Sequence, residues 1–293
     1  MSEFSRIGLV GRPGSDRALH TLKRLIRYLQ GRGADVVLEE ETSNALPGHT
    51  LEVSNNETLG KTCDLVIVVG GDGSLLGAAR ALSRYKVPLL GVNRGRLGFL
   101  TDITPNDIET KVEEVLSGKY MMETRFLLDS SVIRKGTLIG GGDALNDVVI
   151  HPGRFIRMIE FELYIDGQFV YSQRSDGLIV STPTGSTAYA LSGGGPIMHP
   201  KLDAIVIVPM NPHTLSSRPI VVDGNSEIKI MVGEANSAYP HVTCDGQNHV
   251  VTNPGDEIHI HKKPHKLHLI HPLNHNFYET CRTKLGWGSH LGD

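Results

Sequence analysis

The sequence predicts a parallel α/β domain followed by a mainly antiparallel β domain. A run of branched apolar residues at 66–69 is typical of a strand buried on both faces. Such runs alternate with helical stretches over residues 1–119, which indicates a parallel sheet with crossover helices. Beyond residue 120 apolar residues alternate with polar ones, which indicates antiparallel strands with one buried face.

The composition is that of a soluble globular protein. With 293 residues, 39% of them hydrophobic and 21% charged, the chain can bury a proper core and favours two domains over one. A formal net charge of -3 provides no basic field, so we expect neither nucleic acid nor a membrane surface as a partner. Three scattered cysteines without C-x-x-C spacing indicate reduced thiols, and the apolar run 7–10 is too short for a signal peptide core. We therefore expect a cytoplasmic protein.

The first domain, residues 1–119, reads as a Rossmann-like α/β fold. We expect strands at 7–10, 36–38, 65–69 and 89–92. Helices are expected after Ser15 as far as Gly31, over 75–82 and over 105–117. Neither G-x-G-x-x-G nor the Walker signature follows any of these strands, so neither common nucleotide fingerprint is present.

The second domain, residues 120–275, shows the period of β-strands. At 159–165 the apolar residues fall on one strand face, and Asp166-Gly167 then predicts a tight hairpin turn. Further strands are expected at 204–208, 219–222, 228–232, 241–244, 257–261 and 267–270. The tail, 276–293, contains a helix over 277–285 and is expected to return to the first domain.

The strand at 65–69 runs into Gly70, Gly71, Asp72 and Gly73. Glycines at the carboxyl end of a buried strand let the backbone approach a ligand closely, because no Cβ intervenes. The helix that follows would direct its first amides at an anion, and Asp72 is placed to accept a proton. We interpret this loop as a phosphate cradle with a built-in base. The alternative is an ordinary turn in which Asp72 only caps the helix.

Two more loops combine glycines with polar side chains. In the stretch 93–100, Arg94 or Arg96 is a candidate for facing acidic oxygens, and a solvated loop is the alternative. The stretch 174–196 is rich in hydroxyls and glycines, which do not form a core, so we interpret it as a polar binding loop. A flexible linker is the alternative there.

Fourteen histidines raise the question of a metal site. The candidates are His259, His261, His265, His268 and His271, but no acidic or cysteine partner stands at ligand spacing. We therefore expect surface histidines rather than a bound transition metal.

Five segments together resemble a known family. They are 70–73, Asn146-Asp147, Asp176-Gly177, 183–189 and 244–247. With the tail 283–287, they are similar to the bacterial NAD kinases over nearly the whole chain. The G-G-D-G loop alone is shared with diacylglycerol-type lipid kinases and 6-phosphofructokinases, and the 183–189 block narrows the resemblance to the NAD enzyme.

The resemblance implies transfer of the γ-phosphoryl group of ATP to the 2′-hydroxyl of the adenosine ribose of NAD. Phosphoryl transfer needs in-line positioning, a cation on the phosphates and a group that takes the hydroxyl proton. Asp72 fits the last role, and the cation would be Mg²⁺ or another divalent ion that comes with ATP, without protein ligands. Gly70, Gly71 and Gly73 would form the phosphate loop. Another G-G-D-G kinase, with a lipid or sugar acceptor, and a non-catalytic nucleotide sensor remain as alternatives.

The same resemblance implies the residues that bind NAD. They are Asp72, Gly73, Asn146, Asp147, Arg157, Arg174, Asp176, Thr187, Ala188, Tyr189, Ala190, Leu191, Ser192 and Gln247. The family usually has Asn-Glu at 146–147, so the Asp147 side chain is shorter by one methylene, or about 1.5 Å. The resemblance also implies a homodimer or homotetramer.

Overall fold

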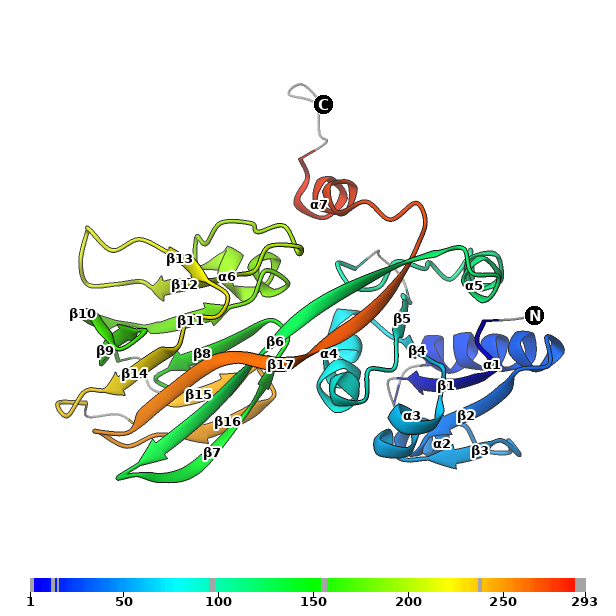
Figure 1. The fold of residues 1–293 in the computed structure, drawn as a ribbon, viewed down its shortest axis with the longest axis horizontal. Coiled ribbons are helices and arrows are strands. Elements are labelled where there is room, and N and C mark those ends of the chain that lie inside the picture. The colour runs from blue at the N-terminus through cyan, green and yellow to red at the C-terminus, as the bar shows by residue number, and fades with distance from the viewer. Residues whose placement is uncertain are drawn as a thin grey trace. The chain divides into compact units, whose positions relative to one another are not determined.

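The computed structural model divides the chain into two compact units (Figure 1). They are residues 1–124 with 266–293, and residues 125–265. The structure describes residues 3–11, 14, 16–94, 98–153, 157–236 and 239–287. The units divide at 124/125 and 265/266, whereas the expected domain boundaries, 119/120 and 275/276, remain a prediction. None of the helices in the described ranges is long and apolar enough to cross a membrane.

The first unit is built on a parallel sheet. Its elements are β1 (Arg6–Gly11), α1 (Asp16–Gly31), β2 (Asp35–Glu39), α2 (Glu40–Asn44), β3 (Glu52–Ser54), α3 (Asn56–Thr62), β4 (Leu65–Val69), α4 (Asp72–Leu82), a 3₁₀ turn (Ser83–Tyr85), β5 (Leu89–Val92), α5 (Ile108–Leu116) and α7 (Phe277–Leu285). The strand order is β3-β2-β1-β4-β5, with every pair parallel. The order reverses between β1 and β4, which is where ligands bind in open α/β sheets. The predicted α/β fold is confirmed.

Strand β4 lies at the centre of this sheet and is buried on both faces. All five of its side chains have 0% exposure, so each stabilises the fold by about 1.5–3 kcal/mol. Helices α1 and α5 pack against one face of the sheet in a shared apolar core (Figure 1). The helix expected over 75–82 begins earlier, at Asp72, and Ser15 lies outside the described residues.

The second unit consists of two antiparallel sheets. Its elements are β7 (Thr137–Ala144), β8 (Asp147–His151), β9 (Ile159–Ile165), β10 (Gln168–Ser175), β11 (Gly177–Ser181), a 3₁₀ turn (Gly185–Thr187), α6 (Tyr189–Ser192), β12 (Ala204–Met210), β13 (Ile220–Asp223), β14 (Ile228–Val232), β15 (His241–Cys244) and β16 (Asn248–Val251). Two long strands, β6 (Tyr120–Arg134) and β17 (Glu257–Pro272), supply residues to both units. One sheet has the order β13-β12-β11-β8-β15-β16. The other contains β10, β9, β14 and β17, with the β6–β7 hairpin.

The six-stranded sheet has two different faces. Its inner face packs on the other sheet through side chains such as Val148 and Val180. Its outer face carries Val149, Ile179 and Val208, which form a smaller core with Ala190. Alternation along each strand separates the two sets. The outer face is therefore where the 183–198 segment packs.

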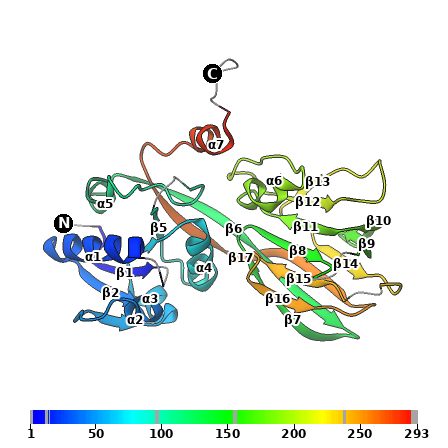
Figure 2. The ribbon, with the colours of Figure 1, turned by 180° about the vertical axis from the view of Figure 1, so that it is seen from behind.

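Two features of the strands differ from expectation. The stretches expected at 257–261 and 267–270 form one continuous strand, β17, with Pro264 at an exposed position. The hairpin of β6 and β7 was not predicted, and β7 contains Gly140, Gly141 and Gly142, which are unusual in the interior of a strand (Figure 2). A Cβ on Gly141 would lie 2.1 Å from the Ser130 carbonyl oxygen, so the glycine permits the close strand pairing.

Candidate functional site

The glycine-rich loop follows β4 directly. Gly71 is the N-cap of α4 and Asp72 is its first residue. A Cβ on Gly70 would lie 2.2 Å from Ser74 Oγ, so Gly70 serves the turn itself. A Cβ on Gly71 or Gly73 would meet no atom within 4 Å. Those two glycines therefore leave open space beside the first amides of the helix, which have no intrahelical acceptor.

The Asp72 carboxylate does not cap its own helix. It accepts hydrogen bonds from Phe99 N at 2.8 Å, Leu100 N at 3.1 Å and Thr101 Oγ1 at 3.2 Å. These donors lie 27 to 29 residues away in sequence, so no local pattern joined them to Asp72. The stretch 93–100 was a candidate from the sequence, but these contacts of the segment 99–101 with Asp72 were not predicted.

Two neighbours fix that segment. Asn93 is buried and its Nδ2 donates to Thr101 Oγ1 at 2.9 Å. A Cβ on Gly98 would lie 2.0 Å from Asp72 Oδ1 and 2.3 Å from Thr101 Oγ1. Position 98 therefore requires glycine if the carboxylate is to stay where it is. The neighbouring candidate Arg94 is partly buried, and Arg96 lies outside the described residues.

A pocket of about 700 Å³ opens on the outer face of the six-stranded sheet, within the second unit. Five of the residues expected to bind NAD line it, namely Asn146, Asp147, Asp176, Ala188 and Tyr189. The remaining lining was not predicted and comprises Val149, His151, Pro152, Gly153, Met210, Thr243, Asp245 and Gly246. Asp147, Val149 and His151 alternate along β8, so a period-two reading of this strand would have found Val149 and His151.

Asp147 is the most unusual titratable group in this pocket. Its residue is only 5% exposed, and burial, followed by the charge of Asp245, raises the pKa of its carboxyl to about 7. Near neutral pH this carboxyl can both donate and accept a hydrogen bond, as recognition of a ribose hydroxyl requires.

Asp245 acts on the backbone of the same segment. Its carboxylate accepts hydrogen bonds from Leu145 N at 3.0 Å, Asn146 N at 2.8 Å and Asp147 N at 3.3 Å. Asp245 N in turn donates to the Asp147 carbonyl oxygen at 3.0 Å. These contacts fix the turn that presents Asn146 and Asp147 to the pocket.

The hydroxyl-rich stretch differs from expectation, because residues 181–186 are buried. Ser181 Oγ donates to the Asn146 carbonyl oxygen at 3.0 Å, and Thr182 Oγ1 donates to that of Leu145. Ser186 Oγ accepts from Met198 N at 2.9 Å. Hydroxyls can enter a protein interior when they satisfy backbone groups in this way. These side chains therefore shape the loop, and the stretch is not a flexible linker.

The other residues expected to bind NAD are among those that the structure describes, and they do not line this pocket. Ala190 is fully buried in the small outer core, so its side chain packs against protein. Thr187 ends the 3₁₀ turn, and Leu191 and Ser192 lie in α6. Arg157 precedes β9, Arg174 lies on β10 and Gln247 lies in the turn between β15 and β16, all three at exposed positions.

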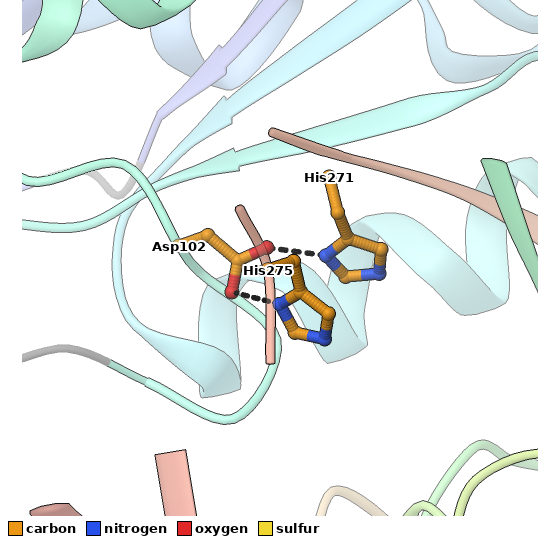
Figure 3. Close-up of side chains that lie close together, drawn as sticks. All are labelled: Asp102, His271 and His275. Carbon is orange, nitrogen blue, oxygen red and sulfur yellow. Dashed lines mark hydrogen bonds and ion pairs between the residues drawn. The ribbon is translucent and has the colours of Figure 1, made fainter. Parts of the chain in front are cut away.

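The expectation that the histidines lie at the surface is wrong for His271, which is 2% exposed. Its Nδ1 forms an ion pair with Asp102, and His275 Nδ1 lies 3.2 Å from the other oxygen of that carboxylate (Figure 3). Asp102 is 169 residues from His271 in sequence, which is why no ligand spacing revealed it. All three residues belong to the first unit.

Comparison with known proteins agrees with the fold. The ATP-NAD kinase N-terminal domain matches residues 7–120, and the ATP-NAD kinase C-terminal domain matches residues 145–272. The chain is 66% identical over 292 residues to an NAD kinase of Ectopseudomonas mendocina, which covers 100% of this chain and 99% of the relative. It is 68% identical over 289 residues to an NAD kinase of Hahella chejuensis, with 99% and 98% covered.

Two solved structures share the fold. A yeast NADH kinase, solved in complex with NADH, has a TM-score of 0.88 at 24% identity, with 98% of this chain and 89% of that chain covered. An NAD kinase from Archaeoglobus fulgidus, solved in complex with ATP, has a TM-score of 0.73 at 27% identity, with 97% of each chain covered. From the two domain matches and the full-length relatives, the chain belongs to the ATP-NAD kinase family.

Proposed function

We propose that this chain transfers the γ-phosphoryl group of ATP to the 2′-hydroxyl of the adenosine ribose of NAD. The ribose oxygen bonds to the γ-phosphorus while the bond to the β,γ-bridging oxygen breaks, so the products are NADP and ADP. Membership of the ATP-NAD kinase family supports this reaction over a lipid or sugar acceptor.

The observation that carries the proposal is the pocket of about 700 Å³. It gathers Asn146, Asp147, Asp176 and Tyr189 from separate segments of the second unit. We assign Asn146 and Asp147 to the ribose hydroxyls, Asp176 to the nicotinamide part and Tyr189 to the adenine part of NAD. Tyr189 is 46% exposed, so its ring is available to a ligand.

We assign the proton of the 2′-hydroxyl to Asp72. A carboxylate is a weak base for an alcohol, so Asp72 orients the hydroxyl and accepts its proton late, once bond formation has acidified it. Among the residues that the structure describes, Phe99, Leu100 and Thr101 take three of its roughly four acceptor positions, and we assign the fourth to the substrate. The open space beside Gly71 and Gly73 supports their assignment to the ATP phosphates.

Three finer points belong to the same proposal. We expect Mg²⁺ to enter with ATP as part of the substrate and to neutralise the phosphate oxygens. We also expect a homodimer or homotetramer in a cytoplasmic location. Omission of Mg²⁺ from the assay tests the first point, and light scattering coupled to size exclusion tests the assembly.

The experiment is to incubate the purified protein with Mg²⁺, ATP and NAD and to detect NADP with an NADP-specific dehydrogenase. We expect NADP only when all three components are present. The variant Asp72→Asn should retain NAD binding by calorimetry and lose turnover by at least about a hundredfold, the scale of a lost acid-base group.

Thr101→Val is the matched control, because it removes one hydrogen bond to Asp72 and leaves the carboxylate in place. We expect it to lose much less turnover than Asp72→Asn. Full turnover in Asp72→Asn would overturn the assignment of the proton acceptor. Binding of NAD without NADP formation by the wild type would instead favour a nucleotide sensor.

A further inference from the structure

The first unit contains a compact cluster of metal-ligating side chains that lies outside the residues assigned to NAD or ATP. Asp102 follows β5, His271 lies at the end of β17 and His275 precedes α7. One potential ligand atom from each residue lies within 4.8 Å of the other two. Figure 3 shows both imidazole rings directing Nδ1 at the carboxylate of Asp102.

One distance already suits a small transition metal ion, and the direct contact between His271 Nδ1 and Asp102 would have to open to admit it. Tetrahedral Zn²⁺ with bonds of about 2.0–2.2 Å holds its ligand atoms about 3.3 Å apart. His275 Nδ1 already lies 3.2 Å from Asp102 Oδ1. The two rings are stacked, with centroids 4.1 Å apart and planes at 24°, and both direct Nδ1 at the Asp102 carboxylate (Figure 3). Small rotations of these side chains would bring the three ligand atoms around one ion.

A second carboxylate lies next to His271, at a contact distance without hydrogen-bond geometry. Its Nε2 lies 3.3 Å from Glu123 Oε2. Histidines that bind metals almost always present their other ring nitrogen to a carboxylate, a carbonyl or water, which fixes the tautomer and leaves the first nitrogen to the metal. Glu123 therefore stands where the second shell of a metal site would place a carboxylate.

An opening for the ion and for a water ligand is also present. A cavity of about 200 Å³ reaches Asp102 and His275, and its lining includes Asp107, Asn276 and Glu279. Both Asp102 and His275 are accessible from it, with side-chain exposures of 10% and 12%, whereas His271 closes the back of the cluster at 2%.

We propose that Asp102, His271 and His275 form a binding site for a divalent transition metal ion such as Zn²⁺. Two imidazoles and one carboxylate select Zn²⁺ and its neighbours over Mg²⁺, which prefers oxygen ligands only. The ion bound here would thus differ from the Mg²⁺ that accompanies ATP, and the proposal does not depend on the proposed function. Three protein ligands leave a fourth position for water from the cavity.

The test is equilibrium dialysis of the chelator-stripped, full-length protein against Zn²⁺ in the presence of excess Mg²⁺, with bound zinc measured by atomic absorption. We expect one tightly bound ion per chain in the wild type. His275→Ala should weaken binding by at least about a hundredfold, since even second-shell changes cost ten- to a hundredfold. Circular dichroism checks that this variant is folded.

The matched control is His241→Ala, which removes the middle member of the three-histidine group His151, His241 and His249 in the second unit. We expect it to bind zinc like the wild type. Absence of tight zinc binding by the wild type, equal affinity in His275→Ala, or loss of binding in His241→Ala would each overturn the proposal. If His275→Ala does not fold, Co²⁺-loaded wild type must show the visible absorption of a tetrahedral ion, and its absence would count against the site.

Discussion

Asp72 illustrates how much one side chain depends on its neighbours. Its carboxylate is not held by its own helix but by two amides and a hydroxyl of the segment 99–101. A carboxylate bound in this way loses rotational freedom before any substrate arrives, and such pre-orientation lowers the entropic barrier to reaction. Substitutions beside Asp72 should therefore affect turnover more than binding.

Gly98→Ala tests this dependence. The new Cβ would lie 2.0 Å from Asp72 Oδ1, so the carboxylate must move. We expect turnover to fall by about a hundredfold, the effect of a displacement of about 1 Å, with NAD affinity nearly unchanged. Steady-state kinetics and calorimetry measure the two quantities. Gly77→Ala is the control, since its Cβ meets nothing within 4 Å, and turnover equal in the two variants would contradict the prediction.

Gly73→Ala separates function from folding. Gly73 lies in the first turn of α4 and an added Cβ would meet no protein atom within 4 Å, so the fold has no need of glycine here. Alanine should stabilise the protein by up to about 1 kcal/mol. If the space beside Gly73 holds the phosphates, the methyl group should raise the KM for ATP by at least about tenfold. A higher melting temperature with an unchanged KM would mean that ATP does not occupy this space.

At the scale of elements, the turn before β8 is fixed from a distant strand. The Asp245 carboxylate, just after β15, accepts three backbone hydrogen bonds from Leu145, Asn146 and Asp147. Asp245→Ala should destabilise the protein by about 1–3 kcal/mol, because amides lose their acceptor, and should weaken NAD binding. Urea unfolding and calorimetry check this.

Asp245→Asn keeps one acceptor oxygen, so we expect it to recover part of both losses. Glu57→Ala, which removes an exposed helical ion pair with Lys61, provides the baseline for a change at the surface. If Asp245→Ala loses no more stability than Glu57→Ala, the turn does not need the three hydrogen bonds to the Asp245 carboxylate.

The elements that the sequence predicted best are those with a strong local period. Strand β4 and helix α7 lie where the sequence placed them. For β4 the reason is plain, because its continuous apolar run matches a strand buried on both faces. The β6–β7 hairpin was missed because no local signal marks it, and Gly141 is required by the Ser130 carbonyl oxygen across the hairpin. Helix α4 begins at Asp72 because Gly71 supplies an extended N-cap, which a search for an apolar face does not detect.

At the scale of the whole molecule, the candidate sites also contain some groups that a local motif predicts and others that depend on tertiary contacts. Asn146, Asp147, Asp176 and Tyr189 were predicted because they stand in recognisable motifs, and one pocket gathers them. The contacts that hold these groups, from Asp245 and from the segment 99–101, depend on tertiary neighbours. Asp102 and His271, which are 169 residues apart, are the extreme case. Motifs therefore predict the groups that meet a ligand better than the groups that position them.

The free energy of unfolding of the whole molecule should depend on pH through Asp147. Its pKa rises from 3.8 to about 7 on folding. Between these values the folded protein holds a proton that the unfolded chain has released, so the free energy of unfolding falls as pH rises. The contribution is complete below about pH 4 and lost above about pH 7. Three pKa units correspond to about 4 kcal/mol, and we expect about half, because the pocket admits water. Asp147→Asn lacks this dependence. Its free energy of unfolding should therefore increase relative to that of the wild type as the pH is raised from 5 to 8. Urea unfolding of both proteins at pH 5 and pH 8 measures this change. If the free energies of unfolding of the two proteins differ equally at both pH values, the pKa of Asp147 is not raised on folding.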